Sequence, residues 1–156
     1  MIRKTLMTTT VTAIAITAVF ATTGTMPGVS DPARMESLYQ LHCQGCHLPG
    51  GEGFPEHDVP RMTDTLGHFA RLEEGRRYLI QVPGSFGAPI DNQDLAEITN
   101  WMIYTFSPNT VDETFKPFTA EEVSRLRKAY DGDILAKREE LVDALKAAGN
   151  YPDSTQ

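Results

Sequence analysis

The sequence predicts an all-α fold, and two observations support this prediction. Apolar residues recur at three- and four-residue steps in several stretches, which is the spacing of one face of a helix. No stretch alternates apolar and polar residues for long enough to predict a strand. Hydrophobic residues make up 40% and charged residues 22% of the 156 residues, proportions that are ordinary for a single globular domain.

The first predicted helix begins at Asp31-Pro32, where a capping residue precedes a proline that suits the first helical turn. Its apolar stripe continues into "LHCQGCHLPG" at residues 41–50, so one helix face is expected to carry both cysteines of the chain. Residues 48–62 are rich in Gly and Pro and predict an irregular loop.

Four further helices are expected. One lies within residues 69–81 and is ended by Val82-Pro83-Gly84, and the next begins at Asp91 and carries Trp101. Residues 107–118 are interpreted as a linker. Thr119 and Glu122 have the spacing of a capping box, which opens a helix that includes Val123 and Tyr130. The last helix runs from about Ile134 up to Gly149.

The N-terminus has the pattern of a cleavable signal peptide over residues 1–21, followed by a flexible lead-in over residues 22–30. Two basic residues precede an apolar run that is short for a membrane span, and small residues follow at a cleavage position. The alternative is an uncleaved anchor. Cleavage would leave 12 Lys and Arg against 21 Asp and Glu, a charge of −9 instead of −7. This balance argues against nucleic-acid binding and against stable membrane association after cleavage.

The pair Cys43 and Cys46, with His47 directly behind it, allows four interpretations. A disulfide across two residues closes a very small loop and strains easily. A thioredoxin-like dithiol needs a strand before the motif, and the sequence predicts none. A zinc site would need two more ligands from the chain's 4 histidines, at unsuitable spacing. Covalent haem attachment needs two thiols one helical turn apart and an imidazole next in the chain, and this interpretation is favoured.

These residues make the chain resemble the class I cytochrome c family over about residues 31–106. The shared features are Cys43-Gln-Gly-Cys46-His47 at the end of a first helix, a glycine-rich loop, Val59-Pro60-Arg61-Met62, and "IDNQDLAEITNWMI" as the last helix of the family domain. The resemblance implies a haem domain of three to four helices over residues 31–107, plus a linker and C-terminal helical extension over residues 108–156. It also implies one covalent haem c.

The same resemblance assigns roles to single residues. Cys43 and Cys46 would form the thioethers and His47 would be the proximal axial ligand. The Pro60 carbonyl would accept a hydrogen bond from the ring of His47, and His68 would lie beside a haem propionate. The family takes its distal methionine from the loop before the last helix, but Val82-Pro83 and Ala88-Pro89 hold no methionine there.

The identity of the sixth ligand is therefore open. Met62 is the candidate distal ligand, because it lies in a loop from which a thioether could reach the iron. The alternative is that Met62 only packs against the ring edge. The distal ligand could also be His68, or the sixth position could be open.

The function expected from the resemblance is electron transport, without enzymatic catalysis, although peroxidatic activity is not excluded. The expected protein is a periplasmic monohaem c-type cytochrome. A periplasmic dehydrogenase would be its donor, and an oxidase or another cytochrome its acceptor. The alternative is a haem protein that binds or senses NO, CO or peroxide at a weak or open distal site.

Overall fold

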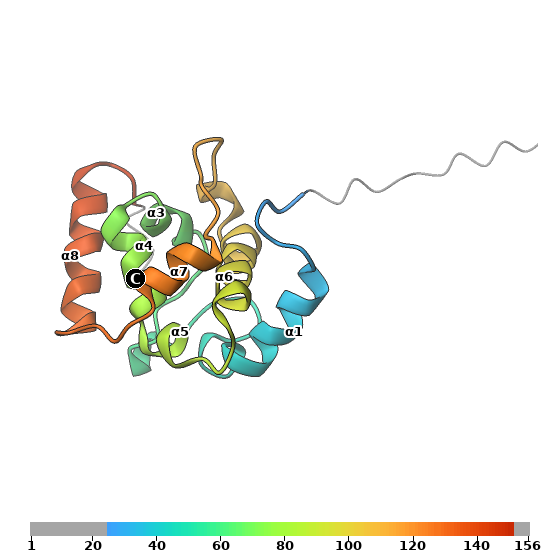
Figure 1. Ribbon diagram of the computed structural model, residues 1–156. Coiled ribbons are helices and arrows are strands. Elements are labelled where there is room, and N and C mark those ends of the chain that lie inside the picture. The colour runs from blue at the N-terminus through green and yellow to red at the C-terminus, as the bar shows by residue number, and fades with distance from the viewer. Residues whose placement is uncertain (1–24, 152–156) are drawn as a thin grey trace, which may run out of the picture.

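The computed structural model describes residues 25–151, and its regular structure is helical (Figure 1). The prediction of an all-α fold is confirmed. A single isolated bridge between Phe54 and Val59 is the one piece of β pairing in this part of the chain. The helices and 3-10 turns are α1 (Pro32–His42), α2 (Gln44–His47), η1 (Pro55–His57), α3 (Leu66–Ala70), α4 (Glu73–Gln81), α5 (Pro83–Gly87), α6 (Asn92–Phe106), η2 (Pro108–Thr110), α7 (Ala120–Leu126) and α8 (Ile134–Ala147).

The predicted signal peptide over residues 1–21 lies outside the described residues, as does most of the predicted lead-in. Within residues 25–151, no helix combines the length and the apolar character that a membrane span requires.

The core is built where α1 crosses α6. Tyr39 of α1 lies against Trp101 and Phe106 of α6, with ring centroids 5.5 and 5.0 Å apart. Aromatic pairs at this separation add to the stabilisation that burial alone supplies. Met35 and Ile103, one from each helix, are fully buried at the same interface. Trp101 of the predicted helix therefore packs at the crossing of α1 and α6.

Three element boundaries differ from the sequence prediction. The helix expected to include Tyr130 is α7, and it ends at Leu126. The first helix does not run through both cysteines, because Cys43 leaves the helical conformation and separates α1 from the single turn α2. Val82-Pro83-Gly84 does end α4, but Pro83 also begins the short helix α5. A proline at the first helical position loses no hydrogen bond, so the residue that stops one helix can start the next.

The capping predictions hold in part. The side chains of Asp31, Asp91 and Thr119 each accept a hydrogen bond from the backbone N–H three residues on. In a complete capping box the Glu122 carboxylate would also accept a bond from the backbone N–H of Thr119. Here that carboxylate binds Arg76 of α4 instead. The partly buried guanidinium of Arg76 offers that carboxylate two charge-assisted bonds, which are stronger than one bond to a backbone amide.

The C-terminal extension packs against the rest of the fold. In Figure 1, α8 stands beside α4 and α3, and α7 crosses in front of α4. A second apolar cluster joins α3, α4, α8 and the end of the described chain. Its buried members are Phe69, Tyr78, Leu141, Val142, Leu145 and Tyr151.

Candidate functional site

The end of α1 places Cys43, Cys46 and His47 close together. The N–H groups of Cys46 and His47 both bond to the carbonyl of Cys43, at 3.1 and 3.0 Å, and close the turn α2. Both cysteines are free thiols; Cys43 is partly buried against the core and Cys46 is exposed. One turn of helix thus carries two thiols and an imidazole.

The environment of the two thiols argues against a redox dithiol. Burial raises the pKa of the Cys43 thiol to about 11, and the neighbouring Cys46 contributes to this rise. Reactive Cys-x-x-Cys pairs need a lowered pKa, because the thiolate is the nucleophile. In residues 25–151, no three His, Cys, Asp or Glu side chains gather as a cluster that could hold a metal ion.

The ring of His47 lies against the loop that follows it. Burial lowers the pKa of His47, and the nearby Pro60 carbonyl partly offsets this effect. The ring is therefore neutral at neutral pH, which is the form that binds metals. Its Nδ1 atom is buried and makes no hydrogen bond of ordinary geometry, although that carbonyl is its neighbour. A histidine that binds a metal needs such a partner to fix the orientation of its ring.

Gly53 allows the loop to bring Pro60 to this position. Its backbone has φ +72°, and a Cβ atom there would lie 2.6 Å from the Pro60 carbonyl carbon and oxygen. The N–H of Gly53 donates to the carbonyl of His47 at 3.1 Å. Phe54 and Val59 exchange two backbone hydrogen bonds, so the chain between them turns back. The loop predicted at 48–62 is irregular but tightly bonded.

Met62, the predicted distal ligand, lies in the main core with 6% of its side chain exposed. Its N–H donates to the Gly51 carbonyl at 2.7 Å, and its carbonyl accepts from Ser107 Oγ at 2.6 Å. Both ends of the residue are thus held in place. This environment favours the packing alternative.

His68, the predicted propionate neighbour, packs against the residues at the end of the described chain. Its ring centroid lies 5.9 Å from that of Tyr151, near the end of the described chain. Burial lowers its pKa, Arg71 lowers it further, and Asp64 partly compensates. Its Nδ1 is also buried without a hydrogen-bond partner. The structure therefore leaves a role for His68 beside a propionate as a prediction.

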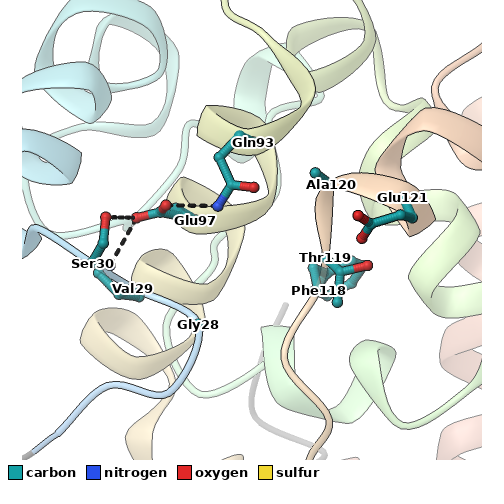
Figure 2. A pocket seen from close by; sticks show the side chains of 9 residues that line it. All are labelled: Gly28, Val29, Ser30, Gln93, Glu97, Phe118, Thr119, Ala120 and Glu121. Atoms are coloured by element: carbon teal, nitrogen blue, oxygen red, sulfur yellow. Dashed lines mark hydrogen bonds between the residues drawn. The ribbon is translucent and has the colours of Figure 1, made fainter.

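A separate surface pocket of about 400 Å³ lies between the lead-in, α6 and the start of α7 (Figure 2). Glu97 is the buried charge in its lining. The carboxylate accepts bonds from Ser30 N–H and Ser30 Oγ at 2.8 and 2.6 Å, and from Gln93 at 2.7 Å. These hydrogen bonds use both carboxylate oxygens of Glu97 and hold the lead-in against α6. The pocket contains none of the predicted site residues.

Sequence reasoning missed two residues that shape the site. Tyr39 donates from its hydroxyl to the Leu48 carbonyl at 2.5 Å, which ties α1 to the residue after His47. Ser107 is fully buried; its Oγ accepts from the N–H groups of Thr65 and Leu66 and donates to Met62. The spacing of Tyr39 indicates only one more member of an apolar stripe. No local sequence pattern indicated the role of Ser107, because its hydrogen-bond partners are more than 40 positions away in the chain.

The donor set fits a covalently held haem. Two thiols one turn apart can add to two vinyl groups, and a neutral imidazole follows with a carbonyl behind it. Leu48 and Phe54, in the loop after the motif, are 40% and 44% exposed. Large apolar side chains left exposed beside such a motif are suited to cover an apolar ring.

Comparison with known proteins agrees with this chemistry. The chain is 32% identical to "Cytochrome c-552" of Thermus thermophilus over 122 aligned positions, which span 64% of this chain and 90% of that protein. It is equally similar to a second "Cytochrome c-552", from another strain of Thermus thermophilus, of which it covers 80%. No family model matches the chain. On the extent of this likeness, and with an all-α fold, the chain belongs to the c-type cytochromes, the haem proteins of electron transport.

Proposed function

We propose that the protein is an exported monohaem c-type cytochrome of class I that carries single electrons between redox proteins of the periplasm. The observation that supports this most is the group formed by Cys43, Cys46 and His47, with the Pro60 carbonyl beside the buried Nδ1 of His47. Haem bound there would supply the Fe(III)/Fe(II) couple. The residues of the chain would bind this haem and orient it.

Each residue of this group has a distinct task in the proposal. The two thiols would hold the haem by thioethers, since each can add its S–H across a vinyl double bond without a leaving group. His47 would bind the metal through Nε2 while its Nδ1–H donates to the Pro60 carbonyl. That hydrogen bond fixes the tautomer and makes the imidazole a better donor. Cys46 is exposed, so the haem edge bonded to it would lie at the surface, where electrons can pass to a partner.

The chain's charge suggests the kind of partner. The formal net charge is −7 at pH 7, and −9 if residues 1–21 are removed. An acidic surface steers towards a basic docking face and speeds association at low salt. We propose a periplasmic dehydrogenase as donor, and an oxidase or another cytochrome as acceptor.

The burial of Met62 supports a second candidate function. If Met62 stays in the core, the sixth position is left to water or to a small ligand. The protein would then bind NO, CO or peroxide instead of only passing electrons. His68 is a less favoured distal ligand, because it packs on Tyr151.

An optical spectrum of the purified protein distinguishes the two candidates. An electron carrier with Met62 bound should show the weak far-red band of methionine-ligated ferric haem, and Met62→Ala should abolish it. The reduced protein should not bind CO. If the wild type lacks the band and its reduced form binds CO readily, the sixth position is open and the ligand-binding function replaces electron transfer.

A further inference from the structure

Arg127 makes an unusual set of contacts at the end of α7. Its guanidinium donates to the carbonyl of Phe86 at 3.3 Å, to the carbonyl of Ile90 at 2.6 Å and to the carbonyl of Ala88. A fourth bond, at 3.3 Å, goes to Oδ1 of Asn92. All four acceptors belong to the segment 86–92, which joins α5 to α6.

This segment has little other structure to hold it. Residues 88–91 are outside any helix, and α5 ends at Gly87 without a backbone cap bond. Carbonyl groups in such a segment need other donors or water. A planar guanidinium carries five N–H donors in a rigid fork, so it can bond to several carbonyls at once. The ammonium group of a lysine, on a flexible stem, would hold them less firmly.

Arg127 itself is fixed from the other side. Its backbone N–H donates to the carbonyl of Val123 at 2.7 Å, and Val123 is fully buried in the main core. Gln81 of α4 donates to the carbonyl of Leu126 at 3.2 Å. The guanidinium is thus held on a rigid support in the C-terminal extension.

The segment 86–92 lies at the end of the molecule where α1 ends and the proposed haem site begins (Figure 1). Ile90 packs against the same core cluster that receives Cys43 and contains Met62. Phe86 is 40% exposed, and it resembles Leu48 and Phe54 in being a large apolar side chain without cover. In Figure 1, α5 and the chain leading into α6 lie at the same end of the molecule as the C-terminal end of α1.

We propose that Arg127 is a positioning residue of the haem site. It holds the segment 86–92 in place as one wall of that site, so the C-terminal extension limits the access of small molecules to the iron. This inference rests on the proposed function, since it assumes that haem is bound beside His47. It gives the extension a task at the site, beyond covering the surface of the domain.

The test compares Arg127→Ala and Arg127→Lys with Arg125→Ala in the haem-loaded protein. Arg125 is an exposed arginine on the same helix and serves as the matched control. Two quantities are measured: hydrogen exchange of the backbone amides in segment 86–92, and the rate at which CO binds to the reduced protein when Met62→Ala is added to the wild type and to every variant, so that Met62 does not block the sixth position.

Arg127→Ala should raise the exchange rate of the segment by about tenfold or more, since local opening is no longer opposed. It should also raise the CO association rate. Arg127→Lys should fall between Arg127→Ala and the wild type, because an ammonium group cannot bond to all four acceptors. Arg125→Ala should match the wild type in both measurements.

Two results would overturn the proposal. One is an unchanged exchange rate in both Arg127 variants, which would mean that Arg127 does not hold the segment. The other is faster exchange with an unchanged CO rate, which would mean that the segment is no wall of the site. If Arg127→Ala does not fold, Arg127→Lys and Asn92→Ala give the same comparison. A wild type without covalent haem would instead disprove the proposed function, while the exchange measurement would still report on the contact.

Discussion

At the scale of single residues, Gly53 determines how closely the loop approaches His47. Its positive φ and the short approach to Pro60 leave no room for a side chain. Gly45, between the two cysteines, differs from Gly53 in the space around it. A Cβ on Gly45 would meet nothing within 4 Å. Substitution of each glycine therefore tests whether the fold and the haem site require the Pro60 carbonyl to lie close to Gly53 and His47.

Gly53→Ala should destabilise the fold by about 1–3 kcal/mol, the usual cost of a non-glycine residue in a strained backbone conformation. It should also move the Pro60 carbonyl away from His47 and change the haem spectrum. Gly45→Ala, as control, should stay within about 1 kcal/mol of the wild type. Chemical denaturation and the optical spectrum measure both effects. Equal stability of the two variants would show that the close approach is not required.

The sequence predicted the residues of this site unevenly, and the reason is the range of each contact. Cys43, Cys46 and His47 are neighbours in one turn, so their spacing alone indicated their chemistry. Pro60 could be connected to His47 only through a family resemblance. Arg127 and Ser107 act on segments about 40 positions away, and local patterns contain no information about such pairs.

At the scale of elements, the longer helices were predicted from their periodicity and caps with shifted boundaries, whereas the short helices α3 and α5 were not predicted. Cys43 and Pro83 lie where helices end or begin, and side-chain periodicity does not report the backbone angles there. The contacts between elements could not be predicted from the sequence. Arg76 of α4 shows this, since it joins Glu122 of α7 and stacks on the ring of Phe118 at 3.8 Å.

Arg76→Leu should lower the free energy of unfolding by about 2 kcal/mol, because it removes several hydrogen bonds from a charged, largely buried donor. Arg77→Leu on the same helix is the matched control. Arg77 pairs with Glu74 only at the surface, so its loss should cost less than about 0.5 kcal/mol. Urea denaturation of both variants measures the difference. Similar costs would mean that the contact between α4 and α7 contributes little.

The contact between the lead-in and α6 should depend on pH. Burial raises the pKa of Glu97, but hydrogen bonds from Ser30 and Gln93 outweigh this effect and hold the pKa below its ordinary value of 4.5. A lowered pKa means that the folded protein favours the ionised carboxylate. The stabilisation is therefore present above about pH 4.5 and is lost as the pH falls through the lowered value.

Ser30→Ala should accordingly lower the melting temperature most near about pH 7 and progressively less towards about pH 3. Ser37→Ala is the control, since Ser37 is an exposed serine of α1 that bonds only within its own helix. Thermal unfolding across this pH range gives the comparison. A deficit in Ser30→Ala that does not change with pH would contradict the role given to the Glu97 carboxylate.

At the scale of the whole molecule, the proposed function depends on one covalently bound haem. The fold places two free thiols and a neutral imidazole on one turn, with Tyr39 bonded to the residue after it and the Pro60 carbonyl beside His47. The fold and the family agree with this arrangement, and electron transfer follows only if the haem is there.

The intact mass of the protein after export and denaturation in acid tests for this haem without any assumption about its distal ligand. We expect a mass higher than that of the chain by one haem, retained after acid-acetone extraction, and its loss in the Cys43→Ala/Cys46→Ala double variant. A wild-type chain that carries no added mass, or that releases its haem into acid-acetone, would contradict covalent attachment at Cys43 and Cys46.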